Sequence, residues 1–396
     1  MRDKLKLIQE CMDRAVDNKE VGGVNLLVNQ HGEEVYYAQS GFADIENNIP
    51  MSRDTIVRLY SQSKPVTAAA AMLLMQDGII DLNEPVGNFF DSFNDQSCII
   101  DGKISKLPWD KHVRIIDLLN MTSGLVYPGC NTEAEKETDA LFADAIGRLH
   151  GDNQMTTLEF AEKIGEFPLQ FVPGSYFQYG TSADVLGAVI EKVTGMKYSA
   201  FLKERLFDPL DMKDTAFYVP EEKKSRLAKV YERIGKDELR LFVGDHLIIR
   251  NDGGENAFES GGAGLFSTVD DYMHFGQMLL NNGVYNGKEI LTKETVRFLT
   301  STSLTPMQQK AFDNWQGLEG HTYGNLMRIL FDPAQAVIIG HKGEYGWDGW
   351  LGAYFMNDPA IETTMIMLTQ MRDFGTGHNP VDDCYYEEKH HRDHHL

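Results

Sequence analysis

The chain has 396 residues, of which 42% are hydrophobic and 24% charged. These proportions are those of a globular protein with room for one large catalytic unit or two lobes around a substantial core. The formal net charge of -22 argues against nucleic acid and anionic membranes as partners, because a strongly acidic surface would repel both. No stretch is apolar over the length needed to cross a bilayer.

The cysteines give no sign of a disulfide framework or a metal site. Cys11, Cys98, Cys130 and Cys384 are scattered, without a CxxC pair or the spacing of metal ligands. We therefore expect reduced thiols. The N-terminal segment lacks the uninterrupted apolar core of a signal peptide, and on that basis we expect a cytoplasmic protein.

The first elements in chain order are a helix and a β-hairpin. Apolar side chains recur at helical spacing from Leu5 to Ala15. Residues 23–30 and 33–38 have the composition of strands, and the His31-Gly32 pair between them is typical of a turn. The two runs therefore predict paired antiparallel strands.

The middle of the chain has mostly helical periodicity, and the last third returns to strand-like runs. The clearest helical segments are residues 115–121, 185–193 and 270–280. The strand-like segments are residues 326–330, 351–356 and 363–368. Strands near both ends with helices between them predict an α+β fold, in which both ends of the chain build one antiparallel sheet and the middle forms a helical lobe.

The most informative short motif is Ser61-Gln62-Ser63-Lys64. A Ser and a Lys three residues apart lie one helical turn apart, so the amine can reach the hydroxyl. Serine needs an adjacent base to become a good nucleophile. A lysine can serve as that base if burial and a helix N-terminus lower its pKa towards neutrality. The motif therefore predicts Ser61 as a nucleophile and Lys64 as its base.

The surroundings of this motif favour catalysis over an ordinary solvated helix face. Residues 55–60 upstream are rich in apolar and β-branched side chains, and the alanine- and methionine-rich run 66–75 downstream predicts a helix that is buried nearly all round. Three longer segments share the character of a known family. They are Gly41-Phe42-Ala43-Asp44, Leu118-Leu119-Asn120-Met121-Thr122-Ser123-Gly124-Leu125 and Ser260-Gly261-Gly262-Ala263-Gly264-Leu265.

With these segments and the Ser-x-x-Lys motif, the chain resembles the serine β-lactamase and penicillin-binding-protein superfamily over nearly its whole length. Within it, the resemblance is to class C-like esterases, the family VIII carboxylesterases. It implies a β-lactamase/transpeptidase-like fold, with an antiparallel sheet flanked by helices and an inserted all-helical lobe. We assign residues 1–75 and 201–396 to a discontinuous α/β domain and 76–200 to the helical lobe, with the active site at their interface.

The family's second element is a tyrosine followed two residues later by Asn or Ser, and Tyr179-Gly180-Thr181 occupies the expected place. The resemblance implies that the Tyr179 phenol shuttles a proton to the leaving group, which requires that Lys64 lower the pKa of the phenol or exchange protons with it. Thr181 departs from the pattern, because it keeps a hydroxyl but lacks an amide for substrate binding. Tyr323-Gly324-Asn325 fits the letters better but lies in the wrong part of the chain.

The third element is normally Lys-Thr-Gly or His-x-Gly on a strand beside the site, and two candidates are present. They are His341-Lys342-Gly343 and Trp347-Asp348-Gly349. We favour the second, because it directly precedes the run Trp350 to Phe355, which has the character of a strand. The resemblance then implies an oxyanion hole made by the backbone N–H groups of Ser61 and Trp350.

The third element also bears on the substrate. A Lys or Arg there would pair with the carboxylate of a β-lactam or a D-Ala-D-Ala peptide. Trp347, Asp348 and Gly349 offer an apolar wall and a negative charge instead, which suit neutral acyl esters or amides. Lys342 would restore the cation, with His341 beside it, if the other candidate were the true element.

Other motifs carry less weight. The glycine-rich segment 260–265 does not follow a strand in a βαβ unit, so we expect a tight loop beside the site and no phosphate cradle. The histidine- and aspartate-rich tail, residues 382–395, predicts a mobile terminus able to bind metal only adventitiously. No Gly-x-Ser-x-Gly elbow is present, which excludes an α/β-hydrolase.

The sequence thus predicts a serine hydrolase that cleaves small acyl esters through a Ser61 acyl-enzyme, with weak β-lactamase activity compatible with it. A β-lactamase, a D-amino-acid peptidase or an acyltransferase would use the same chemistry. A penicillin-binding or sensor protein that does not turn over is the alternative from another class. We expect no metal or cofactor and a small-molecule substrate as the partner, and the oligomeric state stays open.

Overall fold

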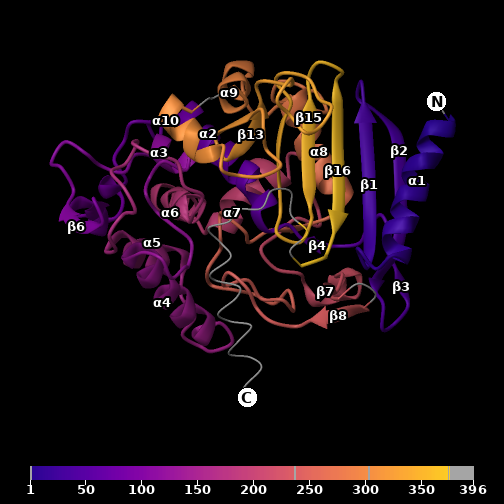
Figure 1. Cartoon of the computed structure of the whole chain (residues 1–396), viewed down its shortest axis with the longest axis horizontal. Coiled ribbons are helices and arrows are strands. Elements are labelled where there is room, and N and C mark those ends of the chain that lie inside the picture. The colour runs from indigo at the N-terminus through magenta and orange to yellow at the C-terminus, as the bar shows by residue number, and fades with distance from the viewer. Residues whose placement is uncertain (1, 236–237, 302–303, 373, 375–396) are drawn as a thin grey trace.

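The computed structural model describes residues 2–235, 238–301, 304–372 and 374. Its centre is an eight-stranded antiparallel sheet, built from strands at both ends of the chain (Figure 1). In spatial order the strands are β12 (His321–Gly324), β13 (Met327–Leu330), β14 (Tyr345–Asp348), β15 (Tyr354–Asp358), β16 (Thr363–Thr369), β1 (Gly23–Gln30), β2 (Glu33–Asp44) and β3 (Ile49–Pro50). The sheet and the helices around it confirm the predicted α+β fold with one antiparallel sheet built from both ends of the chain.

The join between the two ends of the chain is the β1–β16 pair, in which Leu26 lies opposite Met367 and Leu27 opposite Ile366. Successive side chains of a strand point to opposite faces. Leu26 accordingly packs in an apolar cluster with Met12 of helix α1 (Arg2–Asp17), while Leu27 joins the main core. Helix α8 (Val269–Leu280) contacts β1, β15 and β16 on that second face.

The segment between β3 and β12 contains the other helices of the described chain, joined by loops and short strands (Figure 1). Its helices are α2 (Lys64–Gln76), α3 (Ile115–Leu119), α4 (Glu133–Arg148), α5 (Thr157–Gly165), α6 (Ser182–Thr194), α7 (Tyr198–Leu202), α8, α9 (Lys293–Leu299) and α10 (Pro306–Phe312). Its short strands pair as β4 (Val57–Arg58) with β9 (Phe266–Ser267), β5 (Ser97–Ile100) with β6 (Lys103–Lys106), β7 (Val230–Ile234) with β8 (Glu238–Phe242), and β10 (Val284–Tyr285) with β11 (Lys288–Glu289).

Helix α2 connects the sheet to the helices of the middle segment. It contacts β14 on one side and α6 on another, and its residues from Lys64 to Leu74 are all buried. The alanines let neighbouring elements approach closely, and Pro65 suits the first turn because the missing N–H would be unpaired there. The prediction of a helix that is buried nearly all round is confirmed.

One strand prediction had the wrong boundaries. We expected a strand from Trp350 or Leu351, but β15 begins at Tyr354. The preceding residues form the turn between β14 and β15, in which Gly349 N–H donates to Ala353 O at 2.7 Å and Gly352 N–H donates to Gly349 O at 2.8 Å. This turn is packed against the core and therefore contains buried apolar residues such as Leu351 and Ala353. Their pattern in the sequence is that of a strand.

The division into a discontinuous domain and a helical lobe stays a prediction. Within the described ranges, no helix combines the length and the apolar character needed to cross a membrane. The tail at residues 382–395, for which we predict only adventitious metal binding, lies outside the described residues. Cys384 lies outside them too.

Candidate active site

Ser61 lies in a single 3-10 turn, Tyr60–Ser63, that runs directly into α2. It is partly exposed, whereas Tyr60 before it is buried. Tyr60 has a φ of 47°, in the left-handed region that a bulky residue rarely adopts. Such strain persists only where the surroundings impose it and is frequent at active sites. The turn presents the Ser61 hydroxyl at the start of α2.

The Lys64 amine lies among three oxygen atoms. It donates to Ser61 Oγ at 3.1 Å, to the Tyr127 hydroxyl at 3.0 Å and to the carbonyl oxygen of Gly262 at 2.9 Å. Burial lowers the pKa of Lys64 to about 7, although the more distant Asp184 and Asp348 carboxylates act to raise it. A substantial fraction of Lys64 is therefore neutral near pH 7 and able to accept the Ser61 proton.

The glycine-rich loop after Glu259 positions Lys64. Asp184, in the first turn of α6, accepts a hydrogen bond from Gly262 N–H at 3.0 Å and another from the Ser260 hydroxyl. Thr67 on α2 donates to Gly261 O at 2.6 Å. A Cβ on Gly261 would lie 2.2 Å from a carbonyl oxygen of α6, so only glycine fits there. The loop thus serves to hold the catalytic amine, which agrees with its predicted place beside the site.

Tyr179 lies beside Lys64, with its ring centroid 4.5 Å from the amine nitrogen. Its hydroxyl accepts a hydrogen bond from Trp347 Nε1–H at 3.0 Å. Desolvation raises the pKa of Tyr179, while hydrogen bonds with Ser61 and Trp347 act to lower it. The phenol is therefore neutral near pH 7. The pKa of Tyr179 is not below its ordinary value, so Lys64 does not make it a phenolate. Of the two predicted roles, proton exchange between Lys64 and the neutral Tyr179 phenol remains.

Tyr127 is a residue that the sequence reasoning missed. Its hydroxyl is bonded to Lys64, and its ring lies 5.7 Å from the Tyr179 ring. It lies two residues after the segment 118–125 that carried part of the family resemblance, but nothing in that segment shows which side chain turns towards the site. Asp184 was also missed, because the loop that it binds, at Ser260 and Gly262, lies far from it in the sequence.

Behind Tyr179 lies a cluster of aromatic rings. The Trp315, Tyr323 and Trp347 rings have their centroids at 5.0, 6.5 and 5.6 Å from that of Tyr179. The Tyr323 hydroxyl is buried without a hydrogen-bond partner. Tyr323 thus packs behind the second element and takes no part in the polar contacts of Lys64, as expected from its place in the chain.

The two candidates for the third element lie at opposite ends of β14. Trp347 and Asp348 end this strand and are buried, and a Cβ on Gly349 would lie 2.1 Å from the Leu59 carbonyl oxygen, two residues before the nucleophile. His341 precedes the strand, is exposed, and contacts Asp358 at 2.6 Å. Since β14 spans roughly 10 Å, the geometry favours Trp347-Asp348-Gly349.

Two further predicted residues lie close to the site in different ways. Thr181 is fully buried, and its hydroxyl donates to Val126 O at 3.3 Å, so its side chain supports the chain before Tyr127. Trp350 lies in the turn after β14, and its ring packs edge-on against Tyr60 at 5.1 Å and stacks on His246 at 4.0 Å. The Trp350 ring therefore contacts the residue before Ser61, and the role of the Trp350 backbone N–H in an oxyanion hole stays a prediction.

The described residues contain no group of three or more His, Cys, Asp or Glu side chains placed to hold a metal ion. The chemistry available at the site is that of a serine hydroxyl, a lysine amine of lowered pKa, two phenols and a buried carboxylate. This set can transfer a proton and form a covalent bond to an electrophilic carbon.

A family model described as Beta-lactamase matches residues 6–381 of the chain. Among the curated relatives, an uncharacterised protein of Mycobacterium tuberculosis (strain CDC 1551 / Oshkosh) is 29% identical over 91% of this chain and 89% of its own length. Esterase EstB of Burkholderia gladioli is 28% identical over 91% of this chain and 89% of its own length.

Solved structures show the same fold. EstCE1, described as a hydrolase with promiscuous acyltransferase activity, superposes with a TM-score of 0.78 at 26% identity, covering 96% of this chain and 98% of its own. Simvastatin synthase (LovD) from Aspergillus terreus superposes with a TM-score of 0.76 at 21% identity, covering 93% of each chain.

Proposed function

The chain belongs to the Beta-lactamase family, and from that premise we propose that it is a serine hydrolase of the esterase branch, which cleaves small acyl esters through a covalent intermediate on Ser61. The observation that carries the proposal is the contact between the buried Lys64 amine and the Ser61 hydroxyl at 3.1 Å. The similarity to EstB and EstCE1 supports the esterase branch.

The proposed reaction has two steps. Neutral Lys64 takes the proton of Ser61 as Oγ forms a bond to the ester carbonyl carbon, and the N–H groups of Ser61 and Trp350 stabilise the resulting oxyanion. Collapse of this intermediate breaks the bond to the alkoxide, which leaves with a proton from the Tyr179 phenol. The proton that Lys64 took from Ser61 then passes to Tyr179, so that both groups are neutral again before water enters. Water then attacks the acyl group and releases a carboxylic acid and free Ser61, with Lys64 and Tyr179 accepting and returning the proton.

A neutral ester suits the charges at the site. Asp348 is 8% exposed at the end of β14, and its charge opposes that of a carboxylate on a substrate. Lys342, the cation of the other candidate third element, is exposed and lies at the opposite end of the strand. A β-lactam or a D-amino-acid peptide would therefore lack the cationic partner that its carboxylate needs.

Acyl transfer is a second candidate, because an alcohol could replace water in the second step. The description of EstCE1 as a hydrolase with promiscuous acyltransferase activity favours it. A penicillin-binding or sensor protein without turnover would instead hold the acyl group on Ser61. A cytoplasmic location stays a prediction.

The test is turnover of p-nitrophenyl acetate, p-nitrophenyl butyrate and a chromogenic cephalosporin by the wild type and by Ser61→Ala. Ser175→Ala is the matched control, since this serine is exposed and donates only to Val172 O. We expect both esters to be hydrolysed, with a loss of at least about 10³-fold in Ser61→Ala and none in the control.

Ester turnover that survives Ser61→Ala would contradict the mechanism. A stable cephalosporin adduct without ester turnover would favour the sensor. Efficient cephalosporin turnover with poor ester turnover would replace the esterase by a β-lactamase. Adding ethanol and measuring the ethyl ester formed separates acyl transfer from hydrolysis.

A further inference from the structure

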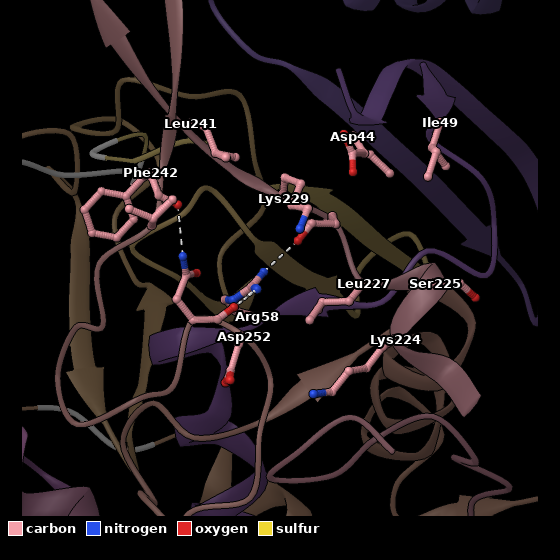
Figure 2. Close-up of a pocket in the computed structure, with 14 residues that line it drawn as sticks. Asp44, Ile49, Arg58, Lys224, Ser225, Leu227, Lys229, Leu241, Phe242 and Asp252 are labelled. Atoms are coloured by element: carbon pink, nitrogen blue, oxygen red, sulfur yellow. Dashed lines mark hydrogen bonds between the residues drawn. The ribbon is translucent and has the colours of Figure 1, made fainter. Parts of the chain in front are cut away.

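A cavity of about 420 Å³ lies between the β2–β3 end of the sheet and the β7–β8 hairpin. Its walls are Asp44 and Ile49 on one side and Leu241 and Phe242 on the other, with Arg58 between them (Figure 2). None of the residues that contact the Lys64 amine lines it. Its size is within the range of small-molecule sites, and the proposed reaction does not use it.

Arg58 is a buried cation without an ion-pair partner among the described residues. It is 3% exposed, and its guanidinium donates only to uncharged oxygens: Ala228 O at 2.8 Å, Gln370 Oε1 at 3.1 Å and Asn251 O. Its Nε–H has no hydrogen-bond partner. Burying a charge without a counter-charge is costly, and burial accordingly lowers the pKa of Arg58 to about 10. Arg58 nevertheless remains charged at neutral pH.

The carboxylates near the cavity do not contact Arg58. Lys224 and Lys229 also line the cavity, against two carboxylates, Asp44 and Asp252. Asp252 pairs with Arg250 at 2.6 Å, and Asp44 accepts two hydrogen bonds from Asn47. Lys224 contacts Glu221 at 3.5 Å, and Asp252 and Asp245 act on Arg58 only through space. Among the described residues, Arg58 and Lys229 therefore line the cavity without a carboxylate at ion-pair distance.

Much of the remaining wall is apolar. Ile49, Leu227, Leu241 and Phe242 line the cavity beside the cations. A ligand that matches both parts has an anionic head and a hydrocarbon or aromatic body, since the apolar body would gain from leaving water. A singly charged carboxylate suits this cavity better than a doubly charged phosphate, because Arg58 and Lys229 are the lining cations without a carboxylate in contact.

We propose that this cavity is a binding site for an organic monocarboxylate, separate from the catalytic site. The carboxylate would lie against Arg58, Lys224 and Lys229, where it supplies the carboxylate contact that Arg58 and Lys229 lack. Its apolar body would lie against Leu241 and Phe242. The Phe242 ring packs edge-on at 5.9 Å against Trp350, which follows the third element. A ligand in the cavity would therefore contact Phe242, whose ring contacts Trp350 in the turn beside Ser61.

The test uses octanoate as the probe and isothermal titration calorimetry on the whole chain. Arg58 joins three segments by its hydrogen bonds, so its removal would disturb the fold, and the better variant is Lys224→Glu with Lys229→Glu. The matched control is Lys103→Glu with Lys288→Glu, which makes the same change of net charge at exposed lysines away from the cavity. Melting temperatures check that all variants are folded.

We expect one octanoate to bind the wild type, with a Kd below about 1 mM. Affinity should fall about tenfold or more in the cavity variant, stay within about twofold in the control, and be lost for the uncharged probe 1-octanol. Equal affinity in all three proteins, or no binding up to about 10 mM, would overturn the proposal. If octanoate competes with an ester substrate and binds the cavity variant as tightly as the wild type, it binds in the catalytic site as a product would. That result would overturn the cavity proposal and leave the proposed function intact.

Discussion

The charge of Asp184 is predicted to set the pH at which the enzyme becomes active. Gly262 links the two groups, because its N–H donates to Asp184 at 3.0 Å and its carbonyl accepts from Lys64 at 2.9 Å. The carboxylate acts to raise the pKa of Lys64, against the larger effect of burial. Replacing Asp184 by Asn keeps an oxygen that can accept from Gly262 and removes the charge. The pKa of Lys64 should then fall further below 7.

The size of this shift follows from the spacing of the charges. Two hydrogen bonds and one residue separate them, which places the charges roughly 7 Å apart, and at an effective dielectric constant of about 20 their attraction is about 2 kcal/mol. A shift of one pKa unit corresponds to about 1.4 kcal/mol. Asp184→Asn should therefore lower the pKa of Lys64 by roughly one to two units.

The assay is kcat/KM for p-nitrophenyl acetate from about pH 5 to pH 9, since this parameter reports the pKa values of the free enzyme. Activity needs neutral Lys64, so it should rise with pH through a midpoint near 7 in the wild type and one to two units lower in Asp184→Asn. The matched control is Asp271→Asn, another buried carboxylate whose partners are Asp214 and Thr215. Its midpoint should not move. An unmoved midpoint in Asp184→Asn would refute the electrostatic link to Lys64.

Other substitutions test the remaining parts of the site. Tyr179→Phe should lower kcat/KM by about 10² to 10³-fold with little change in melting temperature, and an active Tyr179→Phe enzyme would assign the proton transfer to another group. Trp347→Phe removes the hydrogen-bond donor to that phenol and should lower kcat/KM by a smaller factor. Gly349→Ala should destabilise the fold by about 2 kcal/mol or more in urea unfolding, because its Cβ would lie 2.1 Å from Leu59 O; unchanged stability would contradict that close contact. His341→Ala should leave kcat/KM within about twofold, and a large loss would restore the other third element.

Much of the fold could be predicted from the sequence because it depends on local patterns. The sequence predicts the first hairpin at residues 23–30 and 33–38. β1 has the first of these ranges, and β2 begins at Glu33 as predicted but extends to Asp44. The helix 185–193 lies within α6. These elements have alternating or helical periodicity that the core preserves. The turn at Trp350 could not be recognised, because its apolar residues imitate a strand and their direction depends on packing.

The catalytic pair could be predicted for a similar reason. Ser61 and Lys64 are one turn apart, so a local motif fixes their contact. Tyr127 and Gly262 contact the same amine from distant parts of the chain, and Asp184 is linked to it through Gly262. Only the folded structure brings them together. The loop that contains Gly262 was expected beside the site, but Tyr127 and Asp184 are common residue types at positions without a distinctive motif.

The acyl-enzyme on Ser61 is the central claim, and intact-mass analysis after rapid acid quench tests it most directly. Mixing the enzyme with excess p-nitrophenyl butyrate should add the mass of one butyryl group, which peptide mapping should place on the peptide that contains Ser61. Lys64→Met should abolish this adduct within the same mixing time, since no base then accepts the Ser61 proton. A butyryl group on another residue, or one that forms equally fast in Ser61→Ala, would contradict the account.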